Sequence, residues 1–284
     1  MLPRSGAMDL PGHSYEGRNS VQRARLQLLW EFVRREIARQ YKGSRLGIAW
    51  TVLNPLFLLV IYTVVFSAFL GFRARGETGG RGQSGGLQYA LMIFSGMVPF
   101  RVLSEAMTRS AGCISANVDL VKRVVFPAEI LPVSVALAAF ANGLFGLVVL
   151  LAMALVVQGT LPITLVYLPA IWAVQLMMAV AIAYFLSAAG TLVRDIGAVM
   201  PHATMALMFL TPVVYPLDML PARFQALEML NPAAIIVLSH RNAVLYGEQP
   251  LWLPLGVLAG ASLVLLYAGR RWFLAQKRFF PEVL

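Results

Sequence analysis

Residues 128–157 read AEILPVSVALAAFANGLFGLVVLLAMALVV. The only charged side chain in this stretch is Glu129, close to its beginning. A helix needs about 20 mostly apolar residues to cross roughly 30 Å of hydrocarbon, and it satisfies its backbone hydrogen bonds internally. The stretch is therefore long enough to cross a bilayer, even with a tilt.

Five further apolar stretches follow the same pattern, with short polar breaks between them. The predicted spans are Ile48–Phe72, Leu87–Met107, Ala128–Val157, Thr164–Leu192, Gly197–Val214 and Leu251–Tyr267. Hydrophobic residues make up 59% of the chain and charged residues only 13%. A soluble fold would need a core larger than 284 residues can cover with polar surface. The sequence predicts an all-α polytopic membrane protein, with a transmembrane domain over 48–284 behind an N-terminal segment, 1–47.

The distribution of charge predicts the orientation of the chain. The net charge is +10, but the basic residues flank apolar spans, which argues against a nucleic-acid-binding surface. Lysine and arginine concentrate in 1–47, in 108–127, in 193–196 and after the last span. Because cytoplasmic segments are enriched in these residues, we expect both termini to be cytoplasmic. A single cysteine, Cys113, rules out an intrachain disulfide.

The segment 20–41 is predicted to form an amphipathic helix at the membrane interface. Apolar residues recur along it at steps of three or four: Leu26, Leu29 or Trp30, Val33, Ile37 and Tyr41. Arginines occupy most of the other faces, which is typical of a helix that lies in the headgroup region. A basic helix packed on a soluble partner is the alternative.

The stretch 215–250 is too long for a simple turn and carries many apolar residues. We predict two short helices, 220–230 and 233–246, with a break at Asn231-Pro232, because proline disfavours helix at the residue before it. Neither helix could cross the bilayer alone. Irregular backbone at membrane depth must be covered by protein or line a cavity, so a re-entrant external hairpin is expected.

Motifs for catalysis are missing from the sequence. It contains no G-x-x-x-x-G-K-[ST] phosphate loop, and its three histidines are scattered without metal-ligand spacing. We therefore expect no catalytic residue, no metal site and no cofactor in this chain.

Two cytoplasmic segments are candidates for function. In Tyr41–Leu56, we expect Tyr41, Lys42 and Arg45 to lie at headgroup level. They could bind lipid phosphate or serve as ordinary positive-inside anchors. In Ala116–Pro132, apolar side chains would be exposed unless another subunit or the chain's own bundle covers them. The residues proposed to contact a partner are Asn117, Leu120, Val121, Lys122, Arg123 and Phe126.

In these two segments the chain resembles the membrane subunit of ABC-2 exporters, in the branch that moves O-antigen, capsule or teichoic acid polymers. The resemblance implies six spans, an interface helix, a coupling helix within 110–126 and external gate helices within 217–246. It also implies a homodimer with two separate ATPase chains that hold ATP and magnesium, and a lipid-linked polysaccharide as substrate. The expected location is the bacterial inner membrane. An exporter of a lipo-oligosaccharide or drug, or a secondary transporter, is the alternative.

Two groups of intramembrane residues complete the predicted site. Tyr62, Phe66 and Phe69 recur at helical spacing and could line a path for sugars, although packed or lipid-facing aromatic residues are the alternative. Arg101, Glu105 and Arg109 lie four residues apart on one helix face. We expect them to form a self-satisfying charge network, with a contact to the substrate headgroup as the second interpretation.

Overall fold

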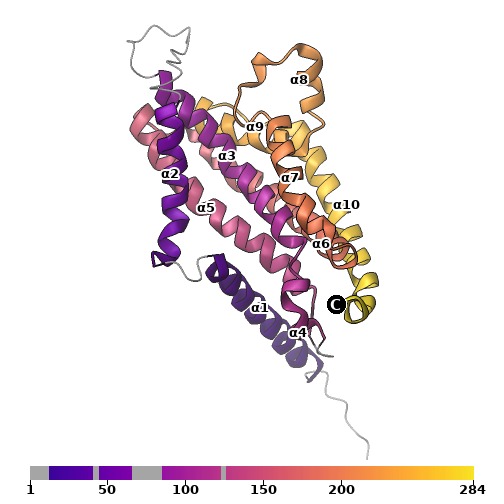
Figure 1. Cartoon of the computed structure of the whole chain (residues 1–284). Coiled ribbons are helices and arrows are strands. Elements are labelled where there is room, and N and C mark those ends of the chain that lie inside the picture. The colour runs from indigo at the N-terminus through magenta and orange to yellow at the C-terminus, as the bar shows by residue number, and fades with distance from the viewer. Residues whose placement is uncertain (1–12, 41–44, 66–84, 123–125) are drawn as a thin grey trace, which may run out of the picture.

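The computed structural model describes residues 13–40, 45–65, 85–122 and 126–284. Every regular element within these ranges is a helix (Figure 1). The long helices are α1 His13–Gln40, α2 Trp50–Val64, α3 Gly85–Ser110, α5 Ile130–Gln158, α6 Leu168–Leu192, α7 Asp195–Leu210 and α10 Trp252–Gln276. The short elements are η1 Gly47–Ala49, η3 Ser115–Asn117, α4 Val118–Val121, η4 Ile163–Tyr167, η5 Leu217–Met219, α8 Ala222–Glu228, α9 Pro232–Arg241, η6 Asn242–Tyr246, η7 Lys277–Phe279 and α11 Phe280–Val283.

Among the described residues, four helical segments are long and apolar enough to cross a membrane: Gly86–Ser110, Ile130–Gln158, Ile163–Leu192 and Trp252–Phe279. They correspond to the second, third, fourth and sixth predicted spans. Helix α7 has 16 residues and ends at Leu210, short of the predicted Val214. Of the first predicted span, α2 is described up to Val64, and 66–72 lie outside the described residues.

The last helix extends nine residues beyond the predicted end of its span, from Tyr267 to Gln276. Arg270 and Arg271 mark the edge of the apolar stretch, but charged residues do not terminate a helix. Beyond them Phe273 is fully buried. Its ring packs edge-on against Tyr184 of α6, with ring centroids 5.6 Å apart. Packing of α10 on α6 therefore continues past the apolar stretch.

Two large apolar cores and a small cluster of alanines hold the described part of the bundle together. The larger core joins α3, α5, α6 and α9 through residues such as Ile93, Leu150, Ile171 and Ile236. The smaller core brings α1 together with the segment after α3, the first turns of α5 and the C-terminal helices. Its members include Phe32, Ile114, Leu131, Tyr184 and Phe280. The smaller core lies where α1, α4 and the C terminus gather, and α8 lies at the opposite end of the bundle (Figure 1).

Helix α1 turns one face towards the bundle. Phe32 and Val33 are buried, and Leu29 packs beside them. Leu26 and Trp30 are instead 65% and 61% exposed, so only part of the predicted apolar stripe contacts protein. Exposed Leu and Trp beside several arginines are compatible with the headgroup region of a membrane, and the interfacial placement stays a prediction.

The backbone after α3 approaches α6 closely at Gly190. A Cβ at this position would lie 2.0 Å from the carbonyl oxygen of Ala111, directly after α3. Backbone atoms cannot move away as a flexible side chain can. Glycine at 190 therefore fixes the distance between α6 and the start of the segment that leads into α4.

Substitution of Gly190 by alanine tests this packing. Alanine favours helix over glycine by about 1 kcal/mol, so a tolerant site would be stabilised. At 190 the steric clash outweighs that gain, and we expect the melting temperature of the detergent-purified protein to fall by several degrees. Gly256→Ala on α10 is the matched control, because no atom lies within 4 Å of a Cβ there. Equal melting temperatures for the two variants would contradict the packing.

Candidate functional site

A polar cluster joins α1, α3 and α5 at the end of the bundle where α1 lies. Its centre is Arg109, whose Nη1 donates to Glu105 Oε1 at 2.7 Å, one helical turn away. Arg109 Nη2 donates to the Glu36 carboxylate of α1 and, at 3.1 Å, to the backbone oxygen of Glu36. One guanidinium therefore binds two carboxylates from two different helices, as its planar fork of donors allows.

Two amide side chains extend the cluster to α5. Gln40, the last residue of α1, donates through Nε2 to Glu105 Oε1. Asn142 of α5 donates through Nδ2 to Gln40 Oε1 at 2.8 Å and to Glu105 Oε1 at 3.0 Å. Glu105 therefore accepts from all three helices. We call the set Glu36, Arg39, Gln40, Glu105, Arg109, Asn117 and Asn142 the coupling cluster.

The segment that precedes α4 is tied to the same cluster. Arg39 donates to Glu36 Oε1 and, through Nη2, to Asn117 Oδ1, each at 3.2 Å. Asn117 Nδ2 donates to the carbonyl of Cys113 at 2.8 Å. Asn117 is only 6% exposed, so its side chain faces the protein's own interior. Asn117 thus positions the start of α4 relative to α1.

The cluster is partly shielded from solvent. The side chains of Glu36, Glu105 and Arg109 are 10%, 20% and 22% exposed. A charged side chain that is shielded from water to this extent is stable only when it is paired and hydrogen-bonded. Loss of one member would leave its partners unsatisfied, so the cluster favours one relative position of the three helices.

The predicted charge network on α3 forms only in part. Glu105 binds Arg109, but Arg101 makes no ion pair with a carboxylate among the described residues. The reason lies in partners from other helices: Gln40 of α1 and Asn142 of α5 hold Glu105 on the side where it also binds Arg109. Arg101 instead faces a pocket.

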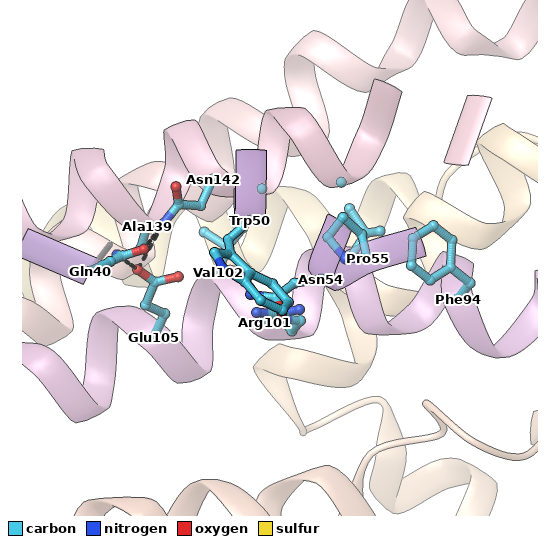
Figure 2. Close-up of a pocket in the computed structure, with 13 residues that line it drawn as sticks. Gln40, Trp50, Asn54, Pro55, Phe94, Arg101, Val102, Glu105, Ala139 and Asn142 are labelled. Atoms are coloured by element: carbon cyan, nitrogen blue, oxygen red, sulfur yellow. Dashed lines mark hydrogen bonds between the residues drawn. The ribbon is translucent and has the colours of Figure 1, made fainter. Parts of the chain in front are cut away.

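This pocket lies between the C-terminal end of α1 and helices α2, α3 and α5, and its volume is about 170 Å³. Figure 2 shows Arg101 beside Trp50 and Asn54 of α2, with Glu105 and Gln40 towards one end and Phe94 towards the other. Pro55 of α2 also lines it. The pocket thus combines one cation, aromatic rings and amides within the membrane-spanning part of the chain.

The predicted partner-contact residues surround α4. Leu120 and Val121 are half-buried against the smaller core, and the Phe126 ring lies 5.5 Å from the Phe32 ring of α1. Lys122 is exposed, and Arg123 lies outside the described residues. The polar surface left on this segment consists of Ser115, Asp119 and Lys122. The role of these residues in docking stays a prediction.

The structure describes only some of the remaining predicted residues. Arg45 is exposed, two residues before η1 begins at Gly47. Tyr41, Lys42, Phe66 and Phe69, together with the side chain of Tyr62, lie outside what the structure describes.

Sequence reasoning misses a buried pair on α9, His240 and Arg241. Proline has no N–H, so Pro99 in α3 leaves the carbonyl of Ser95 without its helical donor. His240 Nδ1 lies 3.0 Å from that oxygen and must be the donor, since a carbonyl only accepts. A proline inside a predicted span is the signal that could have pointed to such a partner, because neighbouring helices supply the missing hydrogen bond.

Arg241 ties α9 to the end of α7. It is 1% exposed, and its Nη2 donates to the carbonyls of Pro212 and Val213 at 2.9 and 3.0 Å. Gly96 of α3 makes room for it, since a Cβ there would lie 2.9 Å from Arg241 Nη2. Asn231 caps the N-terminus of α9, which begins at Pro232, at the predicted Asn231-Pro232 break, and its side chain accepts a hydrogen bond from the Ala233 amide.

These features define a helical, multi-pass membrane protein with a polar cluster at one end and a buried short helix near the other. The sequence matches the ABC-2 type transporter family over residues 27–245, and the chain belongs to that family. It is 29% identical to the O-antigen export system permease protein RfbA of Myxococcus xanthus, over 90% of this chain and 94% of the relative. It is 24% identical to RfbA of Klebsiella pneumoniae, with 90% and 95% covered. The polysialic acid transport protein KpsM of Escherichia coli is 25% identical, with 83% and 88% covered.

Neutralising Glu105 tests the coupling cluster. Glu105→Gln removes the charge that balances Arg109 while it keeps the size of the side chain. Because hydrogen bonds to charged groups contribute about 1.5–3 kcal/mol, we expect the melting temperature of the purified protein to fall by several degrees. Glu31→Gln is the control, since Glu31 is exposed on α1. Wild-type melting temperatures for both variants would contradict the stabilising role of the cluster.

Replacing Arg241 tests the attachment of α9. Arg241→Met keeps an unbranched apolar stem but removes the guanidinium, which leaves the carbonyls of Pro212 and Val213 without this donor. We expect a clear loss of thermal stability, corresponding to about 2–4 kcal/mol. Arg223→Met, on exposed Arg223 of α8, should have little effect. Both variants can be followed by tryptophan fluorescence during heating, and a stable Arg241→Met protein would contradict the assignment.

Proposed function

We propose that this chain is the membrane subunit of an ATP-driven exporter for a lipid-linked polysaccharide of the O-antigen or capsule type. The observation that carries the proposal is the similarity to export permeases over nearly the whole length of both chains. Family membership alone would leave the cargo open, since one fold serves many functions. The agreement between O-antigen and polysialic acid relatives favours a glycan.

The proposed topology has six membrane crossings in the bacterial inner membrane, with both termini in the cytoplasm. Helix α7 would be one of the two additional crossings. Its 16 residues measure about 24 Å, which local thinning of the bilayer can accommodate. Helix α2 would be the other, as part of the predicted span Ile48–Phe72. Helices α8 and α9 would form the external gate, with α9 covered on all sides by protein.

Energy would come from a separate ATPase, because this sequence has no phosphate loop. Two copies of the chain, with two ATPase chains that hold ATP and magnesium, would form the exporter. Tyr62, Phe66 and Phe69 would line the path between the two copies, and Tyr41, Lys42 and Arg45 would contact headgroups.

The coupling cluster supports a mechanism for transmission. An ATPase that presses on α4 through residues such as Leu120, Val121 and Lys122 would move Asn117. Asn117 is bonded to Arg39, so α1 would move with it. Glu36 of α1 is bonded to Arg109, so α3 would follow. Motion at the cytoplasmic end would thereby reach the spanning helices through paired charges, without a separate hinge.

The direct test is to purify the chain in complex with a separate ABC-type ATPase partner and to place the complex in lipid nanodiscs. We expect ATP hydrolysis by the complex to rise with a polyprenyl-linked glycan, and we expect none from this chain alone. A partner variant without its phosphate-loop lysine is the control. ATP turnover by the isolated chain, or a complex that ignores every polyprenyl-linked glycan, would refute the proposal.

A further inference from the structure

Arg101 carries a positive charge well inside the spanning helix α3. It lies on α3, nine residues before the helix ends at Ser110, which is about 14 Å along the axis. A charge this far inside a spanning helix is costly and marks a functional position unless a partner neutralises it. Its side chain is exposed to the pocket, with no described carboxylate in ion-pair range.

The charges around the pocket do not compensate Arg101. In the coupling cluster the carboxylates of Glu36 and Glu105 are bonded to the guanidiniums of Arg39 and Arg109. Two negative charges thus balance two positive ones. Arg101 therefore adds a positive charge that the cluster leaves unbalanced, and the pocket is suited to an anion.

The walls of the pocket indicate what kind of anion it would take. Asn54 and Asn142 contribute amides, and Trp50 contributes an aromatic ring beside the guanidinium. Helix α2 also exposes the apolar side chains of Leu53 and Phe57. The volume of about 170 Å³ is below the roughly 300–1,000 Å³ of pockets that enclose drug-sized ligands. A headgroup fits this space, but an oligosaccharide does not.

We propose that the Arg101 pocket binds the phosphate or pyrophosphate group of an anionic amphiphile. The planar guanidinium binds two phosphate oxygens at once, and charge-assisted hydrogen bonds of this kind are strong. The Asn54 amide donates to one of the remaining oxygens, and the apolar chain lies along α2. Two sources share this chemistry: the polyprenyl carrier of the substrate, which rests on the proposed function, and a phospholipid of the bilayer.

The test compares Arg101→Gln with Arg101→Lys in the complete complex in nanodiscs. Arg271→Gln on α10 is the matched control, because Arg271 is also an exposed arginine near the cytoplasmic end of a spanning helix. One arm measures binding of a radiolabelled polyprenyl pyrophosphate without sugar, in nanodiscs of neutral lipid. The other arm measures retention of phosphatidylglycerol by native mass spectrometry. Monodispersity and yield of each complex establish that the variants fold.

In Arg101→Gln we expect polyprenyl pyrophosphate affinity to fall about tenfold or more, and Arg101→Lys to retain most of it. Loss of phosphatidylglycerol alone would also support the pocket and would assign it to a bilayer lipid. If Arg101→Gln retains both ligands as well as Arg271→Gln does, the proposed binding of phosphate in this pocket is contradicted. If the wild type binds the carrier but its ATPase ignores lipid-linked glycans, the proposed function fails while the pocket stands.

Discussion

The ion pairs of Arg109 with Glu36 and Glu105 are the interaction on which the α1 end of the bundle depends. Glu36 belongs to α1, which is too polar to be held by lipid alone, and Glu105 belongs to α3, which lies inside the bundle. One guanidinium can satisfy both carboxylates only when the two helices are at one distance. The smaller apolar core beneath them excludes water and so strengthens the pairing.

The opposite end of the bundle follows a second rule of the membrane, that every buried backbone group needs a partner. Pro99 frees the Ser95 carbonyl and His240 binds it. The chain beyond α7 leaves further carbonyls, at Pro212 and Val213, and Arg241 binds those. The short helix α9 is thus attached through backbone carbonyls that its neighbours leave without a hydrogen-bond donor. The two ends are therefore fixed by different chemistry, charge pairing at one and backbone satisfaction at the other.

The sequence predicts the long helices well because an apolar run of the right length has few alternatives in lipid. It also locates the break at Asn231-Pro232, where the backbone preference is local. It fails where the outcome depends on distant residues. Spacing along α3 makes Arg101 and Arg109 equivalent partners for Glu105, and only Glu36, Gln40 and Asn142 from other helices decide between them.

The end of α10 and the face of α1 show the same limit. Hydropathy marks the edge of the apolar layer at Tyr267, but the helix continues because Phe273 packs against Tyr184 of α6. The periodicity of α1 identifies an apolar stripe, yet it cannot say that Val33 contacts protein while Trp30 remains exposed. Tertiary packing selects among positions that are equivalent in sequence.

The most direct measurement is the side of the membrane on which the segment between α3 and α4 lies. The native thiol of Cys113 is buried, and burial raises its pKa, so it stays unreactive. Ala116→Cys places an accessible thiol next to Asn117 on this segment. An impermeant maleimide should label it in inverted membrane vesicles and not in intact spheroplasts. Labelling from the outside alone would contradict a cytoplasmic coupling cluster and the energy transfer assigned to it.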